Sequence, residues 1–271
     1  IIILALNFNN MLDELEDLQN QLFGSNNEDD DADKAGNPDT SSEELKILSK
    51  SKDENIRQSV AENPNTDQET LEKLSNDEDY YVKLSVASNK NCSTELLSSL
   101  AEDENENVRS AVAKNINCSS DSLKKLAEDE DEDVVESALH NLFTKNENLI
   151  SDYLDSENDT VLMSIASFNK TDPEILKKLI SSDDKNIIKT VIKNPNVEQA
   201  IIDTLYESLK NKGEIFESDD AFGSFMDTLV HSIASYSSNP KIITELSTHQ
   251  SYEIREALVL NPNTNLDLLE K

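Results

Sequence analysis

The feature that most constrains this chain is an internal repeat about 26 residues long. An apolar anchor recurs in steps of 26, 26, 26, 27, 26, 42 and 25 residues. The anchors are Ile56, Val82, Val108, Val134, Val161, Ile187, Leu229 and Ile254. A period of this length is typical of arrays in which each unit stacks only on its neighbours. The long step indicates an insert of 42 − 26 = 16 residues in the seventh repeat.

Each anchor lies in a predicted helix. Three residues after every anchor the side chain is small, and four residues after it the side chain is apolar, as in Ala111 and Val112. These positions share one helix face. Apolar residues eleven and eight positions before the anchor, such as Leu71 and Leu74, predict a preceding helix. Helices of about 8–11 residues are too short to be stable alone, so stability must come from stacking.

The ends of the helices also follow a pattern. Thr40, Thr66, Thr144 and Thr171 are each followed three residues later by glutamate, which predicts a capping box at the start of the first helix. The second helix ends at an asparagine, which tolerates the left-handed backbone that closes a helix. These asparagines are Asn63, Asn89, Asn115, Asn141, Asn194 and Asn261.

With this pattern in place, segments such as Leu100–Asn115 (LAEDENENVRSAVAKN) resemble the leucine-rich repeat variant family, a relative of HEAT-like repeats. The resemblance covers about residues 40–271 and implies a right-handed superhelix in which one helix per repeat is 3₁₀. The predicted fold is therefore an all-α, right-handed α-solenoid of about eight repeats of about 26 residues, each with two helices. The family's founding form also carries a cysteine-rich iron–sulfur segment before its repeats. This sequence has no such cluster, so no cofactor is predicted.

Composition and periodicity predict four segments. Residues 1–23 form an apolar, amphipathic helix, and residues 24–39 form an acidic disordered linker. Residues 40–271 form the solenoid, with the insert at about 207–223.

The net charge of −32 repels phosphate backbones, so direct nucleic-acid binding is not predicted. It favours a basic protein or peptide partner. Because repeats stack, their acidic turns should form one edge that such a partner could bind. The residues selected for this acidic edge are Asp77, Asp79, Asp103, Glu104, Asp129 and Asp131. The alternative is a solvated edge whose carboxylates are favoured by helix N-termini.

The position directly after the anchor changes character along the chain. It reads Arg57, Lys83, Arg109, Val135, Leu162, Ile188, Val230 and Arg255. In the related repeats a basic residue there commonly fixes the acidic turn. The four aliphatic residues indicate either a wider core or an outward stripe for a ligand. The partner-binding hypothesis therefore names Val135, Leu162, Ile188 and Val230, with Phe216 and Phe222 of the nearby insert.

Nothing in the sequence predicts catalysis. His140, His231 and His249 have no metal-ligand spacing, and there is no glycine-rich phosphate loop or nucleophile elbow. Cys92 and Cys118 occupy the threonine column one period apart, too far for a disulfide between stacked helices. No apolar run is long enough to span a bilayer, so a cytoplasmic protein without membrane contact is expected.

The sequence favours a non-enzymatic scaffold that binds a protein or peptide on the solenoid surface, chiefly along repeats four to seven. The alternative is an acidic inhibitor or immunity-type protein that masks a basic, nucleic-acid-binding partner. A DNA glycosylase of the HEAT-like type would need a basic concave surface and stacking aromatics, whereas this chain is strongly acidic and has no tryptophan. The oligomeric state stays open.

Overall fold

The computed structural model describes residues 28–213 and 223–265, and all regular structure in these ranges is helical. The chain divides into two compact units, residues 1–141 and 142–271. Helix α10 (Glu132–Lys145) runs across the boundary. Within the described ranges, no helix combines the length and the apolar character needed to cross a bilayer.

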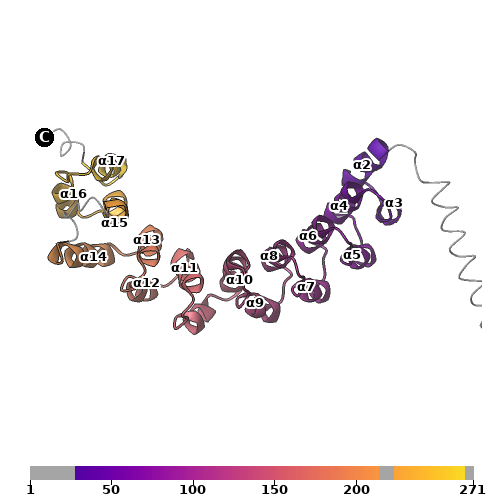
Figure 1. The fold of residues 1–271 in the computed structure, drawn as a ribbon, viewed down its shortest axis with the longest axis horizontal. Coiled ribbons are helices and arrows are strands. Elements are labelled where there is room, and N and C mark those ends of the chain that lie inside the picture. The colour runs from indigo at the N-terminus through magenta and orange to yellow at the C-terminus, as the bar shows by residue number, and fades with distance from the viewer. Residues whose placement is uncertain (1–27, 214–222, 266–271) are drawn as a thin grey trace, which may run out of the picture. The chain divides into compact units, whose positions relative to one another are not determined.

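In the first unit the helices alternate between two rows (Figure 1). One row holds the first helices of the repeats, α3 (Ser42–Leu48), α5 (Gln68–Leu74), α7 (Thr94–Leu100) and α9 (Ser120–Leu126). The other holds the second helices, α4 (Glu54–Glu62), α6 (Tyr80–Ser88), α8 (Glu106–Lys114) and α10. Successive second helices pack on one another, α4 on α6 and α6 on α8. The predicted all-α solenoid of two-helix repeats is confirmed.

The second unit repeats this arrangement with more variation. Its first helices are η1 (Glu147–Tyr153), α12 (Pro173–Leu179), α14 (Gln199–Asn211) and α16 (Pro240–Leu246). Its second helices are α11 (Asp159–Ser167), α13 (Lys185–Lys193), α15 (Gly223–Tyr236) and α17 (Tyr252–Leu260). Only η1 is a 3₁₀ helix among the elements described, so the expected 3₁₀ helix occurs in one repeat rather than in all of them.

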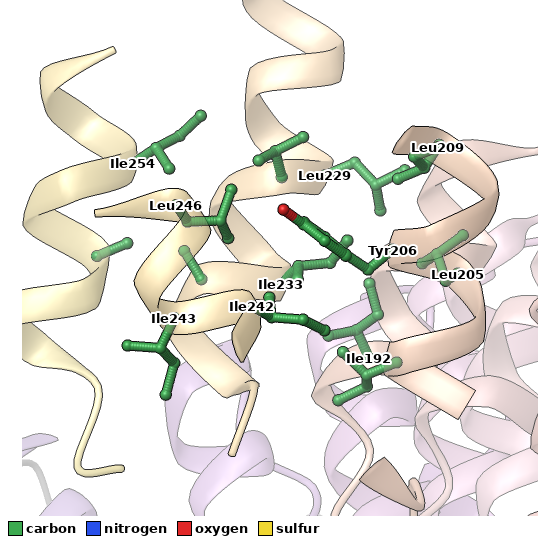
Figure 2. Close-up of a cluster of buried hydrophobic side chains, with 14 of the residues drawn as sticks. Ile192, Leu205, Tyr206, Leu209, Leu229, Ile233, Ile242, Ile243, Leu246 and Ile254 are labelled. Atoms are coloured by element: carbon green, nitrogen blue, oxygen red, sulfur yellow. The ribbon is translucent and has the colours of Figure 1, made fainter. Parts of the chain in front are cut away.

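The core is built from the predicted anchors, every one of which is buried. Burial of one such side chain contributes about 1.5–3 kcal/mol, which compensates for helices too short to persist alone. In the seventh repeat the insert lengthens α14 to 13 residues and α15 to 14. Figure 2 shows Tyr206 of α14 among the aliphatic side chains of this region, including Leu229, Ile233 and Ile242. Its hydroxyl donates to Glu245 at 2.9 Å, so the buried ring keeps a polar partner.

The predicted N-cap column is shifted by one residue. The caps are Ser41, Asp67 and Asp172, each directly after the threonine assigned to that role, and Thr144 lies inside α10. Thr171 instead donates its hydroxyl backwards to the carbonyl of Ile165 at 2.6 Å. The threonine therefore joins the first helix to the second helix before it, while its neighbour caps.

The left-handed backbone predicted for the asparagines that end the second helices is also wrong. Asn63 has φ −65° and ψ 131°, and no non-glycine residue in the described part of the chain has a positive φ. The side chains are used instead: Asn89 Nδ2 donates to Ala61 O at 2.7 Å and Asn63 O at 3.1 Å in the preceding repeat. Corresponding pairs of bonds recur along this asparagine ladder, which comprises Asn63, Asn89, Asn115, Asn141, Asn194 and Asn261. For Asn261 the second acceptor is Ser237 O, one residue later than the equivalent position. In the fifth and seventh repeats Phe168 and Tyr236 occupy the position and offer no amide.

The disordered linker predicted over residues 24–39 is wrong for residues 28–36. These residues form α2 (Glu28–Gly36), which packs on α4 as a further second helix. Asp30 and Lys34, which occupy the anchor position and the position four residues later, form an ion pair of 2.7 Å. A polar pair at these positions is typical of a terminal capping repeat. The predicted helix at 1–23 lies outside the described residues.

Candidate interaction surfaces

The basic residues after the anchors act as clamps between successive repeats of the first unit. Arg57 donates from Nε and Nη2 to both carboxylate oxygens of Asp77, at 2.7 and 2.9 Å. Arg109 holds Asp129 in the same bidentate geometry at 2.7 and 2.8 Å, and Lys83 Nζ donates to Asp103 at 2.6 Å. These pairs are only 9–14% exposed, unlike ordinary surface ion pairs.

Each arginine clamp also fixes the turn before its own helix. Arg57 Nη1 donates to the carbonyls of Ser51 at 3.0 Å and Lys52 at 3.1 Å. One guanidinium therefore joins two successive turns. Burial alone would raise the pKa of Asp77, but bonds from Arg57 and the Asp79 backbone, with the Arg57 charge, hold that pKa below its ordinary value. The pKa of Asp129 is lowered for the same reasons, with Arg109 and Asp131 as the donors.

The clamped aspartates occupy a position with a second, constant task. In seven repeats the side chain five residues before the anchor accepts the backbone N–H two residues later. The acceptors are Ser51, Asp77, Asp103, Asp129, Ser156, Ser182 and His249. An aspartate stands in the three turns that follow a basic clamp. Ser156 and Ser182 stand in turns that follow Val135 and Leu162. These seven turns therefore all keep the turn bond, and an aspartate stands only in those where a cation of the preceding repeat meets it.

This arrangement changes the predicted acidic edge. Asp77, Asp103 and Asp129 are neutralised inside the clamps, and Asp79 and Asp131 accept backbone N–H groups at the starts of α6 and α10. Glu104 is exposed, and so are Glu78 and Glu130 at the equivalent positions. The charges available to a partner in these turns are therefore carried largely by exposed glutamates, with Glu78, Glu104 and Glu130 at the same position of three repeats. Their regular 26-residue spacing was visible in the sequence.

Most of the predicted partner-binding residues that the structure describes are buried rather than exposed to a partner. Val135 and Val230 are each 1% exposed and Ile188 is 8% exposed, so these side chains belong to the core. Only Leu162 is partly exposed. The wider-core interpretation holds for the three buried positions, because an aliphatic side chain without a facing aspartate packs inward. Phe216 and Phe222 lie outside the described residues.

A hollow of about 420 Å³ lies within the second unit, next to Ile188. Its apolar lining comes from Ile188 of α13, Leu205 and Leu209 of α14, and Leu229 of α15, and these residues are themselves almost fully buried. Its rim carries Lys185 and Lys212 with Asp183, Thr204 and Ser208. Sequence reasoning missed Leu205 and Leu209, although their spacing of four residues marks one helix face.

In residues 28–213 and 223–265, no group of three or more His, Cys, Asp or Glu side chains could hold a metal ion. Cys92 and Cys118 are buried and form no disulfide, and burial raises the pKa of the Cys92 thiol to about 11. A thiol with so high a pKa carries little thiolate at neutral pH and is therefore a poor nucleophile.

A comparison of the sequence with known protein families identifies one of these repeats. Residues 54–79, from the start of α4 to the turn before α6, match the family described as leucine rich repeat variant. This stretch is a leucine rich repeat variant. The other repeats share its anchor, small-residue and asparagine columns. Repeat arrays of this kind usually serve as scaffolds for interactions and are typically not enzymes.

Three solved structures are also similar. One is described as a leucine-rich repeat variant with a novel repetitive protein structural motif, at 24% identity and a TM-score of 0.47. The match covers 60% of this chain and 64% of that protein, less than two thirds of its length. Two engineered proteins match at 16% and 15% identity, with TM-scores of 0.32 and 0.21. These matches cover 89% and 84% of this chain, and 85% and 96% of the engineered chains. No curated protein matches the chain.

Proposed function

We propose that this protein is a non-enzymatic scaffold that binds a partner peptide in the hollow of the second unit. The observation that carries the proposal is the combination of an apolar lining with a lysine-bearing rim in a chain of net charge −32. Pockets that bind ligands commonly pair an apolar lining with a few polar groups that set orientation. The hollow also touches Ile188, one of the positions where the basic clamp is replaced.

The rim indicates the chemistry of the peptide. Lys185 and Lys212 are exposed beside the hollow, against the single carboxylate of Asp183. An apolar side chain would enter between Ile188, Leu205 and Leu209, and a neighbouring carboxylate of the peptide would pair with a lysine. Such a rim pair contributes modestly to affinity and more to orientation.

The test is selection of displayed peptides on the full chain, followed by affinity measurement on matched variants. Peptides with an apolar residue next to Asp or Glu should be enriched. Ser208→Trp, which places an indole in the hollow from an exposed position, should weaken their binding at least tenfold. Ser99→Trp, at an exposed position on α7 away from the hollow, is the control and should leave binding unchanged. Enriched peptides that bind Ser208→Trp as well as the parent protein would refute the proposed site.

A second candidate function is the acidic inhibitor that masks a basic partner, and the exposed glutamates favour it. In the first unit, exposed glutamates occupy the same position of three successive turns and take no part in the clamps. They are Glu78, Glu104 and Glu130. In this case Lys- and Arg-rich peptides should be enriched, and their binding should fall steeply with salt. Replacing the three glutamates with glutamine should remove that binding without affecting the hollow. Binding that is insensitive to both salt and these substitutions would exclude this candidate.

A further inference from the structure

A hollow of about 300 Å³ lies in the first unit, between the second helices α6 and α8. These helices pack on one another, and the repeats before and after them, which contain α4 and α10, are both described. The site therefore does not depend on an end of the chain. We call it the α6–α8 hollow, and its lining includes Leu84 and Ser88 of α6 with Asn107, Ser110, Ala111 and Lys114 of α8.

A side chain that bridges the equivalent groove one repeat earlier is missing here. Between α4 and α6, Glu62 Oε1 accepts from Gln58 Nε2 at 2.8 Å and from Ser85 Oγ at 3.1 Å. One period later, the positions of Gln58, Glu62 and Ser85 hold Leu84, Ser88 and Ala111. Serine is shorter than glutamate, and the side chains of leucine and alanine form no hydrogen bonds. The internal carboxylate is therefore lost at this junction, and its place stays open.

The polar side chains around the α6–α8 hollow have no partner in the described part of the chain. Ser110 is only 7% exposed, yet its hydroxyl makes no hydrogen bond there. Ser164, which is also buried on a helix, instead donates to the carbonyl four residues earlier at 2.8 Å. The exposed side chains of Ser88, Asn107 and Lys114 likewise make no hydrogen bond or ion pair with described residues. A buried hydroxyl without a partner is destabilising, and a ligand that accepts its hydrogen bond removes that cost.

The α6–α8 hollow also has a local charge opposite to that of the chain. No carboxylate of a described residue lines it. Helix α6 has no acidic residue, and α8 has one, Glu106, which is eight residues from Lys114 and so about 12 Å away along the helix. In the whole chain 56 of the 271 residues are acidic, so an acid-free surface around a lysine is an exception. The site therefore favours an anionic group.

We propose that the α6–α8 hollow binds the side chain of a glutamate from a partner peptide. The carboxylate accepts hydrogen bonds from Lys114, Ser88 and Ser110, which satisfies the buried hydroxyl and the lysine charge together. The two methylene groups of the glutamate pack on Leu84 and Ala111. Charge and shape therefore select the same side chain.

The chain itself contains the precedent for this occupant. Glu62 brings a carboxylate to the equivalent groove one repeat earlier and bonds it to the next helix through Ser85. In the α6–α8 hollow the partner supplies from outside what Glu62 supplies from within. This site belongs to the first unit, so the proposal does not rest on the hollow of the second unit or on the peptide proposed to bind there.

The test measures binding of short peptides with a central glutamate to the full chain, each beside the same peptide with glutamine. Peptides that use the site should bind about tenfold more tightly with glutamate than with glutamine. Lys114→Gln should weaken the glutamate peptides about tenfold and leave the glutamine peptides unchanged. Lys124→Gln is the control, because it changes the net charge equally at an exposed position on α9 outside the hollow, and it should have no effect.

A second variant closes the hollow from within the chain. Ser88→Glu combined with Ala111→Ser recreates the pair that Glu62 and Ser85 form one repeat earlier. Because both side chains already occur at these positions in a neighbouring repeat, the thermal unfolding curve should stay unchanged. Binding of the glutamate peptides should be lost, since the new glutamate occupies their place. If this double variant does not fold, Lys114→Gln and its control still decide the matter.

The outcomes separate this site from the hollow of the second unit and from other occupants. Ser208→Trp, which blocks the other hollow, should leave the Lys114-dependent peptides unaffected. The proposal is overturned if no glutamate peptide is weakened by Lys114→Gln, or if Lys124→Gln weakens the same peptides equally. It is also overturned if only phosphoserine peptides depend on Lys114, or if sedimentation shows that a second copy of the chain occupies the site through association that Lys114→Gln abolishes.

Discussion

Repeats one to four and repeats five to eight share one helical plan but stabilise their junctions by different means. In the first unit, Arg57, Lys83 and Arg109 each hold an aspartate of the following repeat. In the second unit, Ile188 and Val230 are buried aliphatic residues at the same position. The turn acceptors change in parallel, from aspartate to serine or histidine. A solenoid junction can therefore be ionic or apolar, provided that both sides change together.

The asparagine ladder shows the same contrast, because it is continuous through the first unit and interrupted by Phe168 and Tyr236 in the second. Phe168 is buried and packs edge-on to Phe143, with ring centroids 5.8 Å apart. An aromatic contact there replaces an amide that would bond the backbone. The first unit should accordingly depend more on directed polar contacts, and the second more on apolar packing.

The largest expected effect follows from removing one member of the ladder. Asn115→Ala deletes the donor for the buried carbonyls of Ala87 and Asn89 and the acceptor for the Asn117 N–H. Loss of three bonds, two of them to buried carbonyls, should lower the free energy of unfolding of the first unit by about 3 kcal/mol. Chemical denaturation with amide exchange resolved by helix measures this. The exposed Asn107→Ala on the same helix should change it by less than about 0.5 kcal/mol.

A smaller loss, and one that can be reversed, is expected when a clamp is converted to the apolar type. Arg109→Leu leaves Asp129 with its charge buried and without a cation, and should cost about 2 kcal/mol. Adding Asp129→Ser recreates the Leu162–Ser182 combination and keeps the acceptor for the Asp131 N–H. The double variant should recover at least half of the loss in the same denaturation measurement.

A matched control exists for this clamp in the same unit. Lys125 and Glu102 lie 3.4 Å apart but are 74% and 70% exposed, so Lys125→Leu should have almost no effect. A double variant no more stable than Arg109→Leu would show that the parallel change from aspartate to serine does not compensate, and the comparison between the two units would then fail.

The third prediction concerns acid, which should weaken the first unit before the second. The pKa values of Asp77 and Asp129 lie below the ordinary value of 3.8 in the folded protein. A lowered pKa gives stability that is present above the ordinary value and is lost as the pH falls through the folded value. Exchange in α6 and α8 should therefore accelerate more than exchange in α11 and α13 when the pH falls below about 4. Equal acceleration in both pairs of helices would show that the ionic clamps contribute no differential stability.

Much of this architecture could be predicted from the sequence because each position of the repeat recurs in eight copies, so its character can be compared between them. The anchors, the helix pairs and the insert all followed from the period, and α14 and α15 carry the extra length of the insert. The cap positions were wrong by one residue, because Thr66 and Asp67 are both plausible caps and only the backbone decides between them. Helix α2, which occupies the place of the second helix of a repeat, was not predicted. Its acidic composition concealed the match of Asn37-Pro38 to Asn63-Pro64.

The candidate surfaces were less predictable because they depend on contacts between repeats. Asp77 and Glu78 are adjacent acidic residues of one turn, yet Asp77 is held by Arg57 and Glu78 is exposed. The direction in which Ile188 and Val230 pack depends on whether a facing charge is present. A single repeat does not contain that information, but the joint change of the clamp and turn positions, read across repeats, does.

The smallest expected effect tests whether the hydroxyl bond made by Thr40, Thr66 and Thr171 can be added where cysteine replaces threonine. Cys92 occupies the threonine column, between Thr66, which donates to Val60 O, and Cys118. Cys92→Thr supplies a hydroxyl that can donate to Val86 O, the equivalent carbonyl, in place of a weak thiol donor. The free energy of unfolding should rise by about 0.5–1 kcal/mol. Cys92→Ser, which lacks the methyl group, should gain less because it packs less completely at this fully buried position. A loss of stability in Cys92→Thr would show that the bond made by Thr66 and Thr171 is not transferable to this position.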